Sequence, residues 1–111
     1  EDGDVLEQSD SDVWKRPISE STAAAMQQLM EASAEYGYAS AAQIDGLTVG
    51  GKTGTAETGD DPEHGWFTGY AFDDDGEPAV AVTVFLANSG DGGSSEAAKI
   101  AGDLMKLALD K

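Results

Sequence analysis

A short segment in the middle of the chain, residues 50–55, combines side chains that together could bind an anion. It places one lysine and two threonine hydroxyls around a glycine, and in a strand Thr53 and Thr55 project to the same side. An ammonium and two hydroxyl donors suit a carboxylate, and Gly54 lets a ligand backbone approach without meeting a β-carbon. We therefore expect Lys52, Thr53, Gly54 and Thr55 to form an anion-binding wall.

The backbone of this segment adds to the chemistry if its strand lies at the edge of a sheet. An edge strand has free N–H and C=O groups, so an extended peptide could add to it as a further strand. In that geometry the Thr55 N–H could stabilise a developing oxyanion. Composition alone leaves another interpretation open, in which Lys52 is a solvated strand lysine and the glycines only relieve packing.

A nucleotide-binding interpretation also has to be weighed, because residues 46–53 satisfy the phosphate-loop pattern G-x-x-x-x-G-K-[ST]. A phosphate loop needs a helix directly after its Lys-Thr, so that the helix N-terminus faces the phosphates. Here Gly54 follows at once, and residues 58–62 contain a further glycine, two aspartates and a proline, which do not sustain a helix. We expect the match to be accidental and keep a P-loop nucleotide binder only as an alternative.

The flanking sequence predicts two helices. Apolar residues recur at helical spacing over residues 21–35, with Ser19 or Ser21 as a possible N-cap and an end near Gly37. The last part of the chain, after a Gly- and Ser-rich turn at residues 88–95, shows the same spacing. Both segments are therefore expected to present an apolar face to a core.

Strands are expected between the two helices. Residues rich in threonine, valine, glycine and aromatics predict strands over residues 47–56, 65–72 and 79–87, with a loop at 58–63. The alternation in the last strand and the Asp-Gly pair before it indicate a hairpin. The expected fold class is α+β, an antiparallel sheet of about three strands with helices packed on it, and the two helices are able to cover one face.

Composition excludes several classes of function. The 111 residues carry 22 acidic and 6 basic side chains, a net charge of −16, which repels nucleic acids and anionic lipid. The chain has no cysteine and one histidine, so a thiolate or imidazole-rich metal site is not expected. Composition therefore argues against such a metal site.

A family resemblance is carried by residues 49–57, which read Val-Gly-Gly-Lys-Thr-Gly-Thr-Ala-Glu, by residues 65–71 with Trp-Phe, and by the valine-rich residues 79–87. Together they resemble the C-terminal part of a penicillin-binding protein transpeptidase domain, of the serine D,D-peptidase and β-lactamase-like superfamily. The resemblance extends to both helices and covers nearly the whole chain from Trp14 onward. It implies a partial β-lactamase/transpeptidase-like fold, and it implies neither a metal nor an organic cofactor.

The resemblance also implies roles for individual residues. Lys52 resembles the motif lysine that helps hold the substrate carboxylate and supports the hydrogen-bond network of the catalytic serine. Thr53 and Thr55 resemble the residues whose hydroxyls bind the terminal carboxylate of D-alanyl-D-alanine or of a β-lactam. The Thr55 amide resembles one donor of the oxyanion hole, and Gly54 keeps the strand open to the acyl chain.

Two motifs of the family are missing from this sequence. No serine has a lysine three residues later, and Asn88, the single asparagine, has no serine two positions before it. A Ser-Lys acylation mechanism needs the nucleophile and its base within hydrogen-bond reach. The chain alone is therefore expected to be inactive, and in the family the free edge of its last strand pairs with an N-terminal strand that this chain lacks.

The function expected from the resemblance is that of the C-terminal portion of a penicillin-sensitive D,D-transpeptidase, which cross-links peptidoglycan stem peptides through a serine outside this chain. Residues 1–18 are expected to be an extended acidic lead-in and residues 19–111 the transpeptidase segment. Expected partners are the remainder of the domain with its SxxK and SxN motifs, the stem peptide and β-lactam antibiotics, at the extracytoplasmic face of the bacterial cell membrane. The alternative is a noncatalytic peptide- or β-lactam-binding module.

Overall fold

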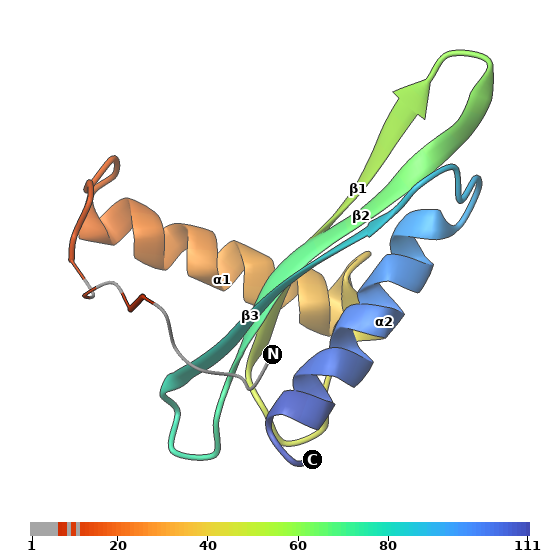
Figure 1. Ribbon diagram of the computed structural model, residues 1–111. Coiled ribbons are helices and arrows are strands. Elements are labelled where there is room, and N and C mark those ends of the chain that lie inside the picture. Colours follow the sequence, from red (N-terminus) through yellow and green to blue (C-terminus); the bar gives the residue numbers. More distant parts are fainter. Residues whose placement is uncertain (1–6, 9, 11) are drawn as a thin grey trace.

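The computed structural model describes residues 7, 8, 10 and 12–111, and the described chain forms one α+β layer structure (Figure 1). The elements follow in the order α1 (Glu20–Tyr36), the 3-10 helix η1 (Ser40–Ala42), β1 (Val49–Thr58), β2 (Asp61–Phe72), β3 (Pro78–Leu86) and α2 (Gly93–Ala108). The expected fold class, a three-stranded antiparallel sheet with helices packed on it, is confirmed.

The sheet is a meander in the order β1-β2-β3, so β1 and β3 are its two edges within the described chain. Lys52 on β1 lies opposite Thr68 on β2, and Thr68 lies opposite Thr83 on β3. β1 and β2 extend beyond the rest of the molecule as a long hairpin (Figure 1). The register of this hairpin decides which side chains accompany the motif strand.

The two helices lie on opposite faces of the sheet, so the expectation that both cover one face is wrong. α2 packs its buried alanines and Met105 in one core with Phe67, Ala71 and Val84. α1 approaches the other face, where the hydroxyl of Tyr70 donates to the carbonyl of Gln27 at 3.3 Å. Because neighbouring residues of a strand point to opposite faces, Tyr70 and Ala71 cannot serve the same layer.

Close backbone approaches fix both helices to the sheet. A β-carbon added to Gly65 would lie 2.3 Å from the carbonyl carbon of Gly93, at the start of α2. A β-carbon added to Gly50 would lie 2.3 Å from the ring of Tyr70, which bonds to α1. Glycine is needed at position 65 because the overlapped atoms are backbone, whereas a larger residue at position 50 would have to displace the Tyr70 ring from its bond to Gln27.

The first helix begins where its sequence predicts, whereas the loop expected over residues 58–63 is replaced by a short turn between two strands. Ser19 is the N-cap of α1, and its hydroxyl accepts from the N–H of Thr22 at 3.2 Å. In place of a loop over residues 58–63, β2 begins at Asp61, and Gly59, with φ at +80°, forms the turn with Asp60. The Thr58 hydroxyl stabilises this turn by donating to the carbonyl of Asp61 at 2.6 Å.

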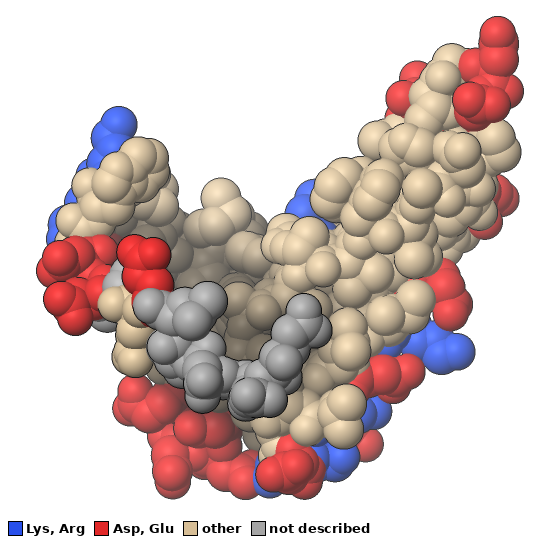
Figure 2. Space-filling view, viewed as in Figure 1, with Lys and Arg blue, Asp and Glu red and all other residues tan. Residues whose placement is uncertain are grey.

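The charged side chains are distributed unevenly over the surface. Figure 2 shows acidic side chains at the tip of the β1–β2 hairpin and along the opposite margin, whereas the middle of this face is mostly uncharged. Among the described residues no helix is long and apolar enough to cross a membrane.

Candidate functional site

The strand that carries the motif lysine lies at the sheet edge, and its hydrogen bonds show which backbone groups face outward. The carbonyl of Thr48 accepts from the N–H of Phe72 at 2.9 Å, so these opposed residues form a hydrogen-bonded pair. In an antiparallel ladder such pairs alternate with pairs whose backbone groups point away from the partner strand. The regular register up to Ala56 therefore directs the N–H and C=O of Thr53 and Thr55 toward the free edge.

Only the second half of this edge is open. Val49 is 3% exposed and Gly51 is buried, and a β-carbon on Gly51 would lie 3.5 Å from that of Ala39, just before η1. From Lys52 onward β1 contains exposed and half-buried positions, apart from Thr53. An extended ligand could therefore pair with the strand at Thr55, as the sequence predicts for an edge strand, whereas little of Thr53 is accessible.

The side chains of the motif leave the strand on both faces and meet at this edge. Thr53 and Thr55 project to the face of α2, and Lys52 projects to the face of Tyr70. The Lys52 side chain bends back, and its Nζ donates to the carbonyl of Thr53, which points to the free edge. The ammonium thus lies beside the outward-facing backbone although its side chain starts on the other face.

The two threonines differ in exposure. Thr55 is exposed, whereas Thr53 is 9% exposed and lies opposite Phe67. No buried side-chain nitrogen or oxygen in the described part of the chain lacks a hydrogen-bond partner, so the Thr53 hydroxyl is not sealed in the core unpaired. Thr55 is consequently the more accessible hydroxyl for a ligand, next to an N–H that faces the same edge.

The position of Lys52 also decides between anion-binding modes. Lys52 and Thr53 lie inside an extended strand that continues to Thr58 and returns as β2, so no helix N-terminus follows them. A phosphate loop requires that helix. The P-loop alternative is therefore wrong.

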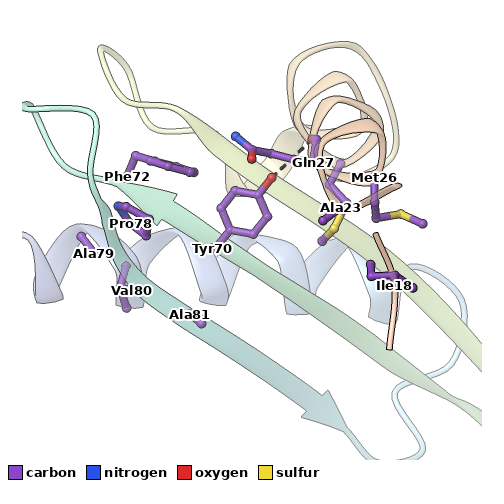
Figure 3. Close-up of a pocket in the computed structure, with 11 residues that line it drawn as sticks. Ile18, Ala23, Met26, Gln27, Tyr70, Phe72, Pro78, Ala79, Val80 and Ala81 are labelled. Atoms are coloured by element: carbon purple, nitrogen blue, oxygen red, sulfur yellow. Dashed lines mark hydrogen bonds between the residues drawn. The ribbon is translucent and has the colours of Figure 1, made fainter. Parts of the chain in front are cut away.

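A second hollow lies away from the motif, between α1 and the sheet. It is a largely apolar groove of about 550 Å³, lined by residues of α1 and its entry and by the facing ends of β2 and β3 (Figure 3). Tyr70 crosses this groove to reach Gln27 of α1. Among the described residues that line the groove none is charged, so these walls suit apolar groups and not the carboxylate expected at the motif.

The aromatic residues near the motif pack on one another. Trp66, opposite Gly54 and 39% exposed, stacks on Phe85 with ring centroids 4.3 Å apart. The Nδ1 of His64 accepts from the N–H of Asn88 at 2.9 Å, and its ring stands edge-on to Phe85. In the described chain no group of three or more His, Cys, Asp or Glu side chains could hold a metal ion.

A pair of hydroxyls that the sequence did not predict stands opposite Lys52. The hydroxyls of Thr68 and Thr83 are 3.0 Å apart, on the sheet face from which the Lys52 side chain leaves. Counting along the hairpin from its two-residue turn, where Thr58 pairs with Asp61, would place Lys52 opposite Phe67. A bulge between Ala56 and Thr58 shifts the register by one residue and brings Thr68 opposite Lys52, so the local sequence did not predict this pair.

Comparisons with known proteins agree with the fold and the motif strand. The family model described as the penicillin binding protein transpeptidase domain matches residues 2–106. The peptidoglycan D,D-transpeptidase PbpA of Mycolicibacterium smegmatis is 37% identical over 81 residues, which are 69% of this chain and 16% of that protein. The chain therefore spans less than a fifth of the length of this curated relative.

Solved structures show the same relationship. Penicillin-binding protein A from M. tuberculosis, in a ceftriaxone acyl-enzyme complex, matches with a TM-score of 0.72 and 33% identity, over 86% of this chain and 23% of that chain. The D,D-transpeptidase domain of a peptidoglycan glycosyltransferase from Eggerthella lenta matches with a TM-score of 0.68 and 32% identity, over 84% of this chain and 21% of that chain.

Proposed function

Because this chain belongs to the penicillin-binding protein transpeptidase family and covers a C-terminal part of that domain, we propose that β1 forms one wall of the active site of a peptidoglycan D,D-transpeptidase. The observation that carries the proposal is the open half of the β1 edge, where the Lys52 ammonium lies beside the outward-facing backbone of Thr53 and Thr55. Residues 19–111 are the transpeptidase segment and residues 1–18 its lead-in.

In this proposal the substrate adds to the open edge as an extended peptide. The hydroxyls of Thr53 and Thr55 bind the terminal carboxylate of the stem peptide, and the Lys52 ammonium holds the same negative charge. A cation at this place matters because a chain of net charge −16 otherwise repels an anionic peptide end. The absence of a side chain at Gly54 leaves room for the acyl chain.

The reaction is an acyl transfer in two steps through a serine outside this chain. The serine oxygen attacks the carbonyl carbon of the D-alanyl-D-alanine bond, the ester forms, and the terminal D-alanine leaves with the serine proton. The amine of a neighbouring stem then attacks the ester, forms the cross-linking amide and returns a proton to the serine. In both steps the Thr55 N–H stabilises the oxyanion on the attacked carbonyl.

The remainder of the domain is the partner that completes this site. The apolar side of α1 is largely uncovered, with Met26 52% and Leu29 66% exposed, and β3 has a free edge in the described chain. An apolar helix face and an open strand edge both favour association with further structure. The chain spans 16% of its curated relative, so we assign these surfaces to contacts within the complete protein and expect the chain alone to be inactive.

β-Lactam binding and location follow from the same assignment. Two solved structures of penicillin-binding protein A from M. tuberculosis are acyl-enzyme complexes, one with ceftriaxone and one with imipenem. A β-lactam carries a carboxylate like the stem peptide, so the same wall serves both and the enzyme is penicillin-sensitive. We place the protein with the cell wall it modifies, at the extracytoplasmic face of the bacterial cell membrane.

Trapping with a fluorescent penicillin tests the proposal. The complete protein, residues 1–111 alone and the complete Lys52→Ala variant are labelled, with Lys99→Ala on the exposed side of α2 as the matched control. We expect covalent label on the complete protein and no label on residues 1–111. The labelling rate should fall at least about tenfold in Lys52→Ala and should stay at the wild-type level in Lys99→Ala. Noncovalent penicillin binding by residues 1–111, with no covalent label on the complete protein, would instead establish the noncatalytic binding module.

A further inference from the structure

Three polar side chains form a row across the sheet, on the face opposite α2. Lys52, Thr68 and Thr83 are directly opposed in register on β1, β2 and β3, and all three are exposed. The hydroxyls of Thr68 and Thr83 are hydrogen-bonded at 3.0 Å. The row therefore starts at the motif lysine and leads away from the substrate edge.

The neighbours of this row are apolar or aromatic. On one side Trp66 stacks on Phe85, and on the other Tyr70 lies opposite Ala81. The threonine pair thus interrupts an aromatic and apolar face at the one register position that faces Lys52. β-propensity alone does not require a hydroxyl there, because valine fits a strand equally well.

The hydrogen-bonding capacities of the row match those of the lysine. An ammonium has three N–H donors, and the Thr53 carbonyl accepts one of them. When Thr68 and Thr83 share one hydrogen bond, lone pairs remain on both oxygens. Residues opposed in an antiparallel pair have Cα atoms about 5.5 Å apart, within reach of the flexible lysine stem.

Substrate binding determines which acceptors the N–H groups of Lys52 can use. In the proposed function the terminal carboxylate of the substrate takes one N–H of the Lys52 ammonium, and in the structure the Thr53 carbonyl accepts another. The third N–H then needs an acceptor of its own. A hydroxyl on the face from which the lysine side chain leaves can accept it.

We propose that Thr68, held by Thr83, is a positioning residue that anchors the Lys52 ammonium when the substrate carboxylate is bound. This inference rests on the proposed function. Thr68 touches no reacting atom and acts only through the lysine. Its loss is expected to slow acylation of bound penicillin and to leave the apparent affinity for penicillin almost unchanged, since the Thr55 hydroxyl and the open edge still bind the ligand.

The experiment measures the acylation rate of the complete protein against penicillin concentration, so that the saturating rate and the half-saturating concentration are separated. For Thr68→Val we expect a saturating rate about tenfold lower, as for the loss of one charge-assisted hydrogen bond. Thr68→Ser, which keeps the hydroxyl, restores the rate, and Thr83→Val gives a smaller loss. Thr48→Val, an exposed threonine outside the row, is the matched control.

A double variant separates positioning from a structural role. If Thr68 acts through the lysine, Thr68→Val has no further effect once Lys52 is alanine. Wild-type rates in Thr68→Val, failure of Thr68→Ser to restore the rate, or an undiminished loss in the Lys52→Ala background would each overturn the inference. In all three cases the proposed function stands as long as Lys52→Ala alone is slow; wild-type acylation by Lys52→Ala overturns the function itself.

Discussion

Adding one methyl group at Gly54 should damage acylation without damaging the fold. A β-carbon at this position would have as its nearest heavy atom the β-carbon of Trp66, at 3.4 Å, and the backbone is not in the left-handed region. Alanine therefore fits, and the free energy of unfolding should change by less than about 1 kcal/mol. The same methyl would stand in the motif strand, where the acyl chain of the substrate has to approach.

The matched control is the same substitution at Gly65, one strand away. Its β-carbon would lie 2.3 Å from the carbonyl carbon and 2.5 Å from the carbonyl oxygen of Gly93, backbone atoms that cannot rotate aside. Gly65→Ala must therefore push α2 from the sheet, at a cost of about 1–3 kcal/mol or more. The three heavy atoms nearest to that β-carbon belong to Gly93 and Ser94, and none of them belongs to the motif strand.

The assay is denaturant unfolding of the complete protein together with fluorescent-penicillin acylation, expressed per folded molecule. We expect Gly54→Ala to unfold like the wild type and to acylate about tenfold more slowly, which is about 1.4 kcal/mol in the barrier. Gly65→Ala should unfold more easily and acylate at close to the wild-type rate while folded. Wild-type acylation by Gly54→Ala, or a destabilisation equal to that of Gly65→Ala, would refute the argument about the motif glycine.

Further predictions concern α1 and its contact with the sheet. Ser19→Ala removes the N-cap acceptor of the Thr22 N–H and should lower the free energy of unfolding by about 1 kcal/mol in denaturant titration, with Ser21→Ala costing less; equal losses would contradict the capping role. Burial, and next the nearby charge of Glu31, raise the pKa of Tyr70 above its usual value of 10.0. The raised pKa means that the folded state favours the protonated Tyr70 hydroxyl. Its contribution to the free energy of unfolding is therefore complete below pH 10 and is lost as the pH rises through the folded pKa. Tyr70→Phe should abolish that alkaline loss, and an unchanged pH profile of unfolding would contradict it.

Local sequence patterns were sufficient to predict most of the elements. Helical spacing and Ser19 located α1 to within one residue at each end, because an N-cap and the glycine at position 37 fix its limits. Alternating valines located β3, since one face of an antiparallel strand packs on the core. These signals are carried by residues close together in the chain.

The parts that could not be predicted depend on pairing between distant residues. Alternation divides a strand into two faces, but it does not say which helix will cover which face, and α1 and α2 proved to lie on opposite ones. Pro62 and its acidic neighbours are typical of a loop, yet they lie in β2. The pairing of Lys52 with Thr68 depends in addition on the bulge between Ala56 and Thr58, which shifts the register by one residue. The outward direction of the Thr55 N–H follows only from the hydrogen bond between Thr48 and Phe72, which no local pattern encodes.

The most direct test of the active-site wall is a crystal structure of the complete protein acylated by a β-lactam. We expect the acyl carbonyl oxygen within hydrogen-bond distance of the Thr55 N–H, and the β-lactam carboxylate on the hydroxyls of Thr53 and Thr55 with the Lys52 ammonium alongside. A carboxylate bound elsewhere, or another strand of the protein paired to the Thr53 and Thr55 edge, would contradict the assignment.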